Sequence, residues 1–151
     1  MKTVATEMNQ ATEEIQIRKR IEDWATAFRR KDINSVLSFF APETVAFDLV
    51  PPLAYTGVAA YRKQWEKLFA SYQGLIEYEI RDLSIITESQ LAFSHSINRI
   101  SGMLLSGHKT GFWLRMTACW RRIDGQWLIG HEHVSVPMDP AKGVAVLDLK
   151  P

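Results

Sequence analysis

Apolar and charged residues alternate along much of the second half of the chain, and this pattern limits the folds open to it. Ile76, Tyr78 and Ile80 alternate with charged residues, and similar alternation covers about residues 90–101, 110–122 and 126–136. A period of two is typical of a β-strand with one buried face. The apolar phase changes at Asp82, which predicts a bulge or a bend there. The chain must therefore build, and then cover, a long curved sheet.

The first half of the chain supplies helices that can cover such a sheet. Apolar residues at helical spacing predict a helix from about residue 12, a short one after Asp32, and a third over about residues 57–72. Asp32 is expected to cap the second helix, and Gly74 to end the third. A short strand is predicted over residues 44–50. Helices followed by a run of antiparallel strands indicate an α+β fold.

One domain accounts for the 151 residues, because this length is ordinary for a single domain. We expect a flexible arm over residues 1–11, the domain over 12–137 and a tail over 138–151. The net charge of +1 argues against nucleic acid and anionic membranes as partners, and no apolar run is long enough to span a membrane. The single Cys119 excludes an internal disulfide and fits the cytoplasm. No cofactor is predicted.

The order of these elements resembles a known superfamily. The segments "KDINSVLSFFAPETVAFD", "TGVAAYRKQW" and "WRRIDGQWLIGHEHVSVP" stand in the order seen in the nuclear-transport-factor-2-like superfamily. Within it, the chain is similar to SnoaL-like and ketosteroid-isomerase-like proteins, and to the association domain of calcium/calmodulin-dependent kinase II. The resemblance implies a cone-shaped sheet whose concave face is covered by three helices, a pocket inside the cone, and a homodimer formed through the sheet.

Asp48 is the first candidate for catalysis. It lies among apolar residues in "AFDLVPP", and a carboxyl group in apolar surroundings can act as a tuned proton acceptor. The resemblance also places it at the general base of ketosteroid isomerase. The alternative is an Asp that ends a strand and binds the loop at Pro51, and the sequence favours neither reading.

The oxyanion donors of ketosteroid isomerase are replaced in this chain. By the resemblance, its tyrosine falls at Trp24, its supporting tyrosine at Trp65 and its donor aspartate at Ala118. An indole N–H can donate a hydrogen bond, but it lacks the acidic O–H of a tyrosine. We therefore expect no steroid isomerisation by the known mechanism.

Glu132 is the second catalytic candidate, and its orientation depends on the turn at Asp124 and Gly125. A two-residue turn would turn His131 and His133 inward, whereas a three-residue loop would turn Glu132 inward. The resemblance favours the three-residue loop, with Glu132 in the pocket and both histidines on the outer, dimer-facing surface. Two histidines are half of a metal site at most, so no metal is predicted.

The remaining pocket residues rest on the resemblance, which makes the Asn98 face of its strand the concave one. We expect Asp48, Asn98, Glu132, Met116 and Trp120 to line one cavity, and Trp127 and Ile129 to lie outside it. The expected ligand-binding residues are Trp24, Tyr61, Trp65, Ser96, Asn98, Met116 and Trp120. The predicted function is binding of a small, largely apolar molecule with proton transfer of the isomerase or cyclase type. The alternative is a non-catalytic association or regulatory module.

Overall fold

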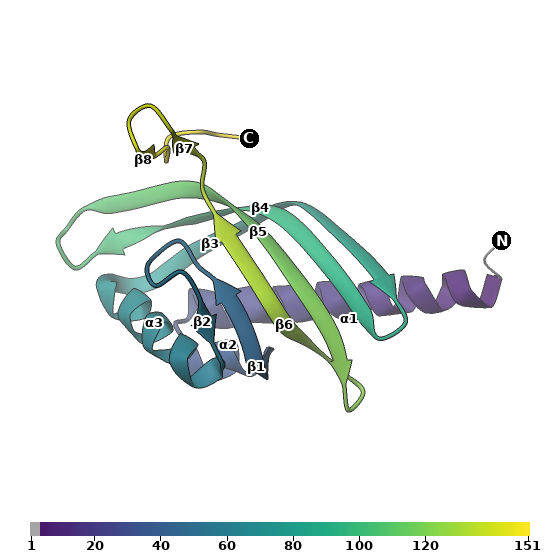
Figure 1. The fold of residues 1–151 in the computed structure, drawn as a ribbon. Coiled ribbons are helices and arrows are strands. Elements are labelled where there is room, and N and C mark those ends of the chain that lie inside the picture. Colours follow the sequence, from purple (N-terminus) through teal and green to yellow (C-terminus); the bar gives the residue numbers. More distant parts are fainter. Residues whose placement is uncertain (1–3) are drawn as a thin grey trace.

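Helix α1 (Val4–Arg29) runs along one face of the sheet, and its N-terminal end projects beyond the strands (Figure 1). The computed structural model describes residues 4–151. The helix begins earlier than the predicted start near residue 12, so residues 4–11 of the expected arm are helical, and 1–3 lie outside the described residues. Polar contacts hold this part: Thr12 Oγ1 donates to the carbonyl of Met8 at 3.0 Å, and Gln10 Nε2 donates to that of Thr87 at 3.2 Å. Because polar side chains make these contacts, the sequence of this part has no helical spacing of apolar residues by which a helix could be predicted.

The short helix α2 (Ile33–Leu37) begins as predicted. The backbone N–H of Ser35 donates to Asp32 Oδ1 at 3.1 Å, which confirms the cap. Strand β1 (Phe40–Phe47) starts and ends earlier than the strand predicted over residues 44–50. Its pairing is irregular between Phe40 and Val45, where Pro42 lies. A proline has no N–H for a ladder, and such positions tolerate it.

Helix α3 (Val58–Ser71) follows the two-residue strand β2 (Tyr55–Thr56) and buries Tyr61, Trp65 and Phe69, as predicted. Gly74 does not end this helix. The chain enters strand β3 at Tyr72, and Gly74 lies within that strand with a φ of 61°. Glycine adopts such a φ at little steric cost, so the residue serves a strand irregularity rather than a helix end.

The main sheet has six strands in the order β2-β1-β6-β5-β4-β3. All neighbours pair antiparallel except β1 and β6, which are parallel, so the sheet is mixed. The sheet curves over α1 and α3 (Figure 1). The α+β fold class is confirmed. The long strands are β3 (Tyr72–Glu88), β4 (Leu91–Leu104), β5 (Lys109–Ile123) and β6 (Gln126–Ser135).

The bulge predicted at Asp82 is present. Asp82 has a φ of 52°, and the register of β3 against β4 shifts between Arg81 and Ser84. The shift changes which residues face the helices, so Ile80 and Leu83 both line the concave side. The strand can then bend without losing its apolar face.

The predicted three-residue loop between β5 and β6 is wrong. Ile123 pairs with Gln126, and Asp124 and Gly125 have φ values of 50° and 77°, as in a two-residue hairpin turn. A bulge then corrects the register, because Trp120 pairs with Ile129 while Cys119 pairs with His131. Gly130 is the extra residue. Glu132 consequently faces inward, as predicted, but its partner on β5 is Ala118 and not the expected Met116.

The chain ends in a small hairpin, β7 (Met138–Asp139) and β8 (Val144–Ala145), which stands apart from the main sheet (Figure 1). Among residues 4–151, no helix is both long and apolar enough to cross a membrane.

Candidate functional site

A cavity of about 270 Å³ lies between the concave face of the sheet and helices α1 and α3. Its size suits a small molecule, and its walls are mainly apolar. Three polar side chains meet at one side of it: Asp48 from the loop after β1, Tyr61 from α3 and Glu132 from β6. The aromatic walls are Trp24, Phe28, Trp65, Tyr72, Tyr78 and Phe112.

Tyr61 joins the two predicted catalytic carboxyl groups. Its hydroxyl oxygen lies 2.7 Å from Glu132 Oε1 and 3.1 Å from Asp48 Oδ2. Asp48 Oδ1 accepts a further bond from the N–H of Leu49 at 2.6 Å. A hydroxyl has one proton and an ionised carboxylate has none, so both contacts of Tyr61 are hydrogen bonds only when one carboxyl is protonated. The cluster of Asp48, Tyr61 and Glu132 therefore holds one proton in addition to that of the Tyr61 hydroxyl, and the three side chains share it through hydrogen bonds.

Burial decides which carboxyl keeps that proton. Glu132 is 1% exposed, and its removal from water raises its pKa from 4.5 to about 8; the charge of Asp48 adds to this, and the Tyr61 bond opposes it. Burial also raises the pKa of the half-buried Asp48, with opposing bonds from Leu49 and Tyr61. Burial and both carboxyl groups hold the pKa of Tyr61 well above its usual range. Glu132, the more deeply buried carboxyl group, is therefore the one that keeps the proton at neutral pH, beside a neutral Tyr61.

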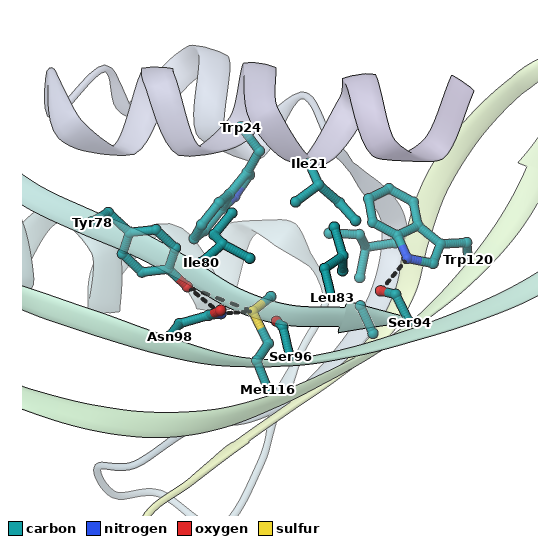
Figure 2. A pocket seen from close by; sticks show the side chains of 12 residues that line it. Ile21, Trp24, Tyr78, Ile80, Leu83, Ser94, Ser96, Asn98, Met116 and Trp120 are labelled. Carbon is teal, nitrogen blue, oxygen red and sulfur yellow. Dashed lines mark hydrogen bonds between the residues drawn. The ribbon is translucent and has the colours of Figure 1, made fainter. Parts of the chain in front are cut away.

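A second, smaller chamber of about 20 Å³, the inner chamber, lies beside the main cavity, and Figure 2 shows the side chains that line it. Trp24, Tyr78 and Met116 line both spaces, so the two spaces adjoin at these side chains. The predicted residues Ser96, Asn98 and Trp120 lie here and not beside Asp48. The expectation of one undivided cavity is therefore wrong, because the side chains of the sheet divide it. Asn98 Nδ2 donates to the Tyr78 hydroxyl at 2.8 Å, and Trp120 Nε1 donates to Ser94 Oγ at 2.9 Å.

Ile129 also lines the inner chamber, which the sequence placed outside it. The bulge at Gly130 explains this correction, since it reverses the alternation of the residues that precede it in β6. Trp127 is buried but lines neither space, as predicted.

Several buried polar atoms around these spaces have no hydrogen-bond partner within residues 4–151. They are Trp24 Nε1, Trp65 Nε1, Asn98 Oδ1 and Glu132 Oε2. Most buried polar atoms in proteins are paired, so such a group of unpaired atoms around one cavity needs an explanation. A ligand that carries polar substituents would provide one.

Tyr78 is the site residue that sequence reasoning missed. The alternation of residues 76–80 correctly predicts that Tyr78 faces inward, but the pattern treats Tyr78 only as an apolar residue. Its hydroxyl group, which a phenylalanine would lack, was the available signal.

The two histidines lie outside the cavity. His131 Nδ1 is 2.7 Å from the carbonyl of Val45, and the ring of Phe47 lies 4.7 Å from that of His131 and 5.6 Å from that of His133. Cys119 lies on the same outer face, beside His131. In the part of the chain that the structure describes, no three His, Cys, Asp or Glu residues are grouped to hold a metal ion.

Comparison with known proteins supports the fold. The model of the SnoaL-like domain matches residues 17–139. A nuclear-transport-factor-2-like protein of unknown function from Pseudomonas putida KT2440 is 33% identical over 93% of this chain and 98% of its own, with a TM-score of 0.86. Comparison with curated proteins finds no match.

Two more distant structures show the fold alone. A ketosteroid isomerase-like protein from Erwinia carotovora atroseptica has a TM-score of 0.69 at 21% identity, covering 80% of this chain and 93% of its own. The association domain of C. elegans CaMKII has a TM-score of 0.68 at 12% identity, covering 85% of this chain and 98% of its own. The family match spans most of the sheet and helices described above, and the chain therefore belongs to the SnoaL-like domain family.

Proposed function

We propose that the chain binds a small, largely apolar molecule in the main cavity and catalyses proton transfer at it. The observation that carries the proposal is the contact of Tyr61 with both Asp48 and Glu132 at the edge of an apolar cavity. Two carboxyl groups whose environments separate their pKa values form an acid and a base at one pH.

Asp48 is the base in this proposal, since it is the less buried of the two carboxyl groups. It takes a proton from the bound molecule and can return it at a second position, which is an isomerisation. Glu132 is the acid. After Asp48 has taken a proton from the bound molecule and Glu132 has given one to it, Tyr61 can pass the proton from Asp48 back to Glu132 and restore the starting state, because its hydroxyl both donates and accepts.

Steroid isomerisation by the known mechanism is excluded from the proposal. Ala118, at the position of the aspartate donor, has no hydrogen-bonding side chain. Trp24 and Trp65 do line the cavity, where they offer only indole N–H groups.

The test uses 5-nitrobenzisoxazole, a small aromatic probe of carboxylate bases. A base removes the proton on its ring carbon while the N–O bond breaks, and the product is a coloured cyanophenolate. We expect the protein to accelerate this elimination above the rate in an equal concentration of acetate. Asp48→Asn should lower the rate by ~10²–10⁴-fold, because the amide cannot accept the proton as a base.

The control is Glu43→Gln, which changes an exposed carboxyl group that pairs with Arg121 at 2.6 Å. Its rate should remain that of the unaltered protein. The melting temperature of Asp48→Asn is measured alongside. An unchanged rate in Asp48→Asn, or a large fall in its melting temperature with unchanged probe binding, would assign Asp48 a structural role in its loop.

We also propose a homodimer formed through the outer face of the sheet. Phe47, Ile86, Leu91 and Phe93 are between 39% and 61% exposed on this face, and such patches mark interaction surfaces. Sedimentation should show a dimer that Phe93→Glu dissociates, whereas Leu53→Glu, at a 97% exposed loop position, should not. A dimer that fails to accelerate the elimination would favour the alternative of a non-catalytic association module.

A further inference from the structure

The inner chamber contains a buried acceptor that no described residue satisfies. Asn98 is 1% exposed, and its Nδ2 donates to Tyr78 and contacts Met116 Sδ at 3.4 Å. Its Oδ1 has no partner among residues 4–151. Leaving a buried amide oxygen unpaired costs stability, so its presence in a chamber wall points to a group that donates to it.

Tyr78 offers a donor in the same chamber. Because its oxygen accepts from Asn98, its own proton must point elsewhere, and the acceptor it finds is Met116 Sδ at 3.7 Å. A thioether sulfur is a weak acceptor. Figure 2 shows Asn98, Tyr78 and Met116 converging at one end of the chamber, below Trp24 of α1. A strong donor and a strong acceptor thus lie side by side.

A hydroxyl group satisfies both, because its oxygen accepts and its O–H donates. It would accept from Tyr78 and donate to Asn98 Oδ1, which closes a ring of three hydrogen bonds with the existing Asn98–Tyr78 bond. A carbonyl oxygen would leave Asn98 Oδ1 unpaired, and a methyl group would leave both unpaired.

We propose that the inner chamber is a subsite for a hydroxyl group, and that the ligand is a small hydroxylated ring compound held with its hydroxyl between Asn98 and Tyr78. The inner chamber of about 20 Å³ has room for one oxygen-sized group, and the main cavity of about 270 Å³ has room for the ring. Aromatic side chains from α1, α3 and the sheet surround that ring position. The inference rests on the proposed function only in taking the cavity as a ligand site.

The test compares indan-5-ol with 5-methylindane by calorimetric titration of the full chain. The two probes have nearly the same shape, and only the first can form the hydrogen bonds. Water solvates a hydroxyl better than a methyl group, so a merely apolar cavity would prefer 5-methylindane. We expect the opposite preference, with indan-5-ol bound at least about tenfold more tightly than 5-methylindane.

Tyr78→Phe and Asn98→Leu should each remove this preference, because each deletes one partner of the hydroxyl. Tyr55→Phe is the matched control: this buried tyrosine donates to the carbonyl of Pro51 at 2.8 Å and does not line the inner chamber, so the loss of its hydroxyl should leave the preference intact. Circular dichroism establishes that each variant is folded.

Equal binding of the two probes, tighter binding of 5-methylindane, or binding of neither would overturn the subsite. So would a preference that survives Tyr78→Phe. Retained preference for indan-5-ol without elimination of 5-nitrobenzisoxazole would overturn the proton-transfer proposal and leave the subsite standing, so the two failures are distinguishable.

Discussion

Replacement of Glu132 by glutamine should make the protein more stable in alkaline solution. Glu132 is 1% exposed, and burial raises its pKa from 4.5 to about 8. A carboxyl group with a raised pKa in the folded state stabilises the fold while it is protonated. Its contribution is complete below about pH 4.5 and is lost as the pH rises toward about 8. Above that range Glu132 is ionised while buried, which lowers the free energy of unfolding.

The size of the effect follows from the two pKa values. At ~1.4 kcal/mol for each tenfold change in proton concentration, the span from 4.5 to about 8 corresponds to about 5 kcal/mol. Glutamine stays neutral at every pH, and its amide N–H can donate to Tyr61 as the protonated carboxyl group does. The variant should match the unaltered protein near pH 4.5 and exceed its unfolding free energy by several kcal/mol at pH 8.5.

The measurement is urea unfolding of both proteins between pH 4.5 and 8.5. Their difference at each pH removes the effect of all other titrating groups. Glu43→Gln is the control, since an exposed ion pair of this kind contributes at most ~1 kcal/mol. The reasoning is refuted if Glu132→Gln follows the pH dependence of the unaltered protein, or is the less stable of the two at pH 8.5.

Further predictions concern the local structure and metal content. Gly125→Ala should lower the unfolding free energy by ~1–2 kcal/mol in urea, because the residue has a φ of 77° that a side chain disfavours; an unchanged midpoint would contradict the two-residue turn. Elemental analysis of untagged protein should find well under one zinc per chain, and a stoichiometric metal whose removal unfolds the protein would contradict this.

Much of the architecture is predictable because it rests on local periodicity. The alternation at Ile76, Tyr78 and Ile80 placed a strand and its inward face, and the phase change at Asp82 marked a bulge that the structure contains. Asp32 could be assigned as a helix cap from its type and position alone. The first turns of α1 escaped prediction because their contacts are polar and partly long-range, such as that of Gln10 with Thr87.

The orientation of Glu132 shows where local reasoning ends. The predicted loop was wrong, and the correct face resulted from a bulge at Gly130 that no turn signal announces. A shift of one residue reverses the face of every side chain in a strand, so such a bulge decides which residues enter the cavity. It brought Glu132 inward and, beyond the prediction, Ile129 as well.

The sequence by itself determined the helices, the strands and the residue types that line the interior, because each depends on neighbours along the chain. Only the tertiary structure decided that Tyr61 contacts both carboxyl groups, 13 and 71 residues away, and that Asn98 and Tyr78 face a separate inner chamber. Hydrogen bonds act over about 3 Å, whereas these partners come from different elements. Their distances, and hence the shared proton and the unpaired amide oxygen, arise only when the sheet closes over the helices.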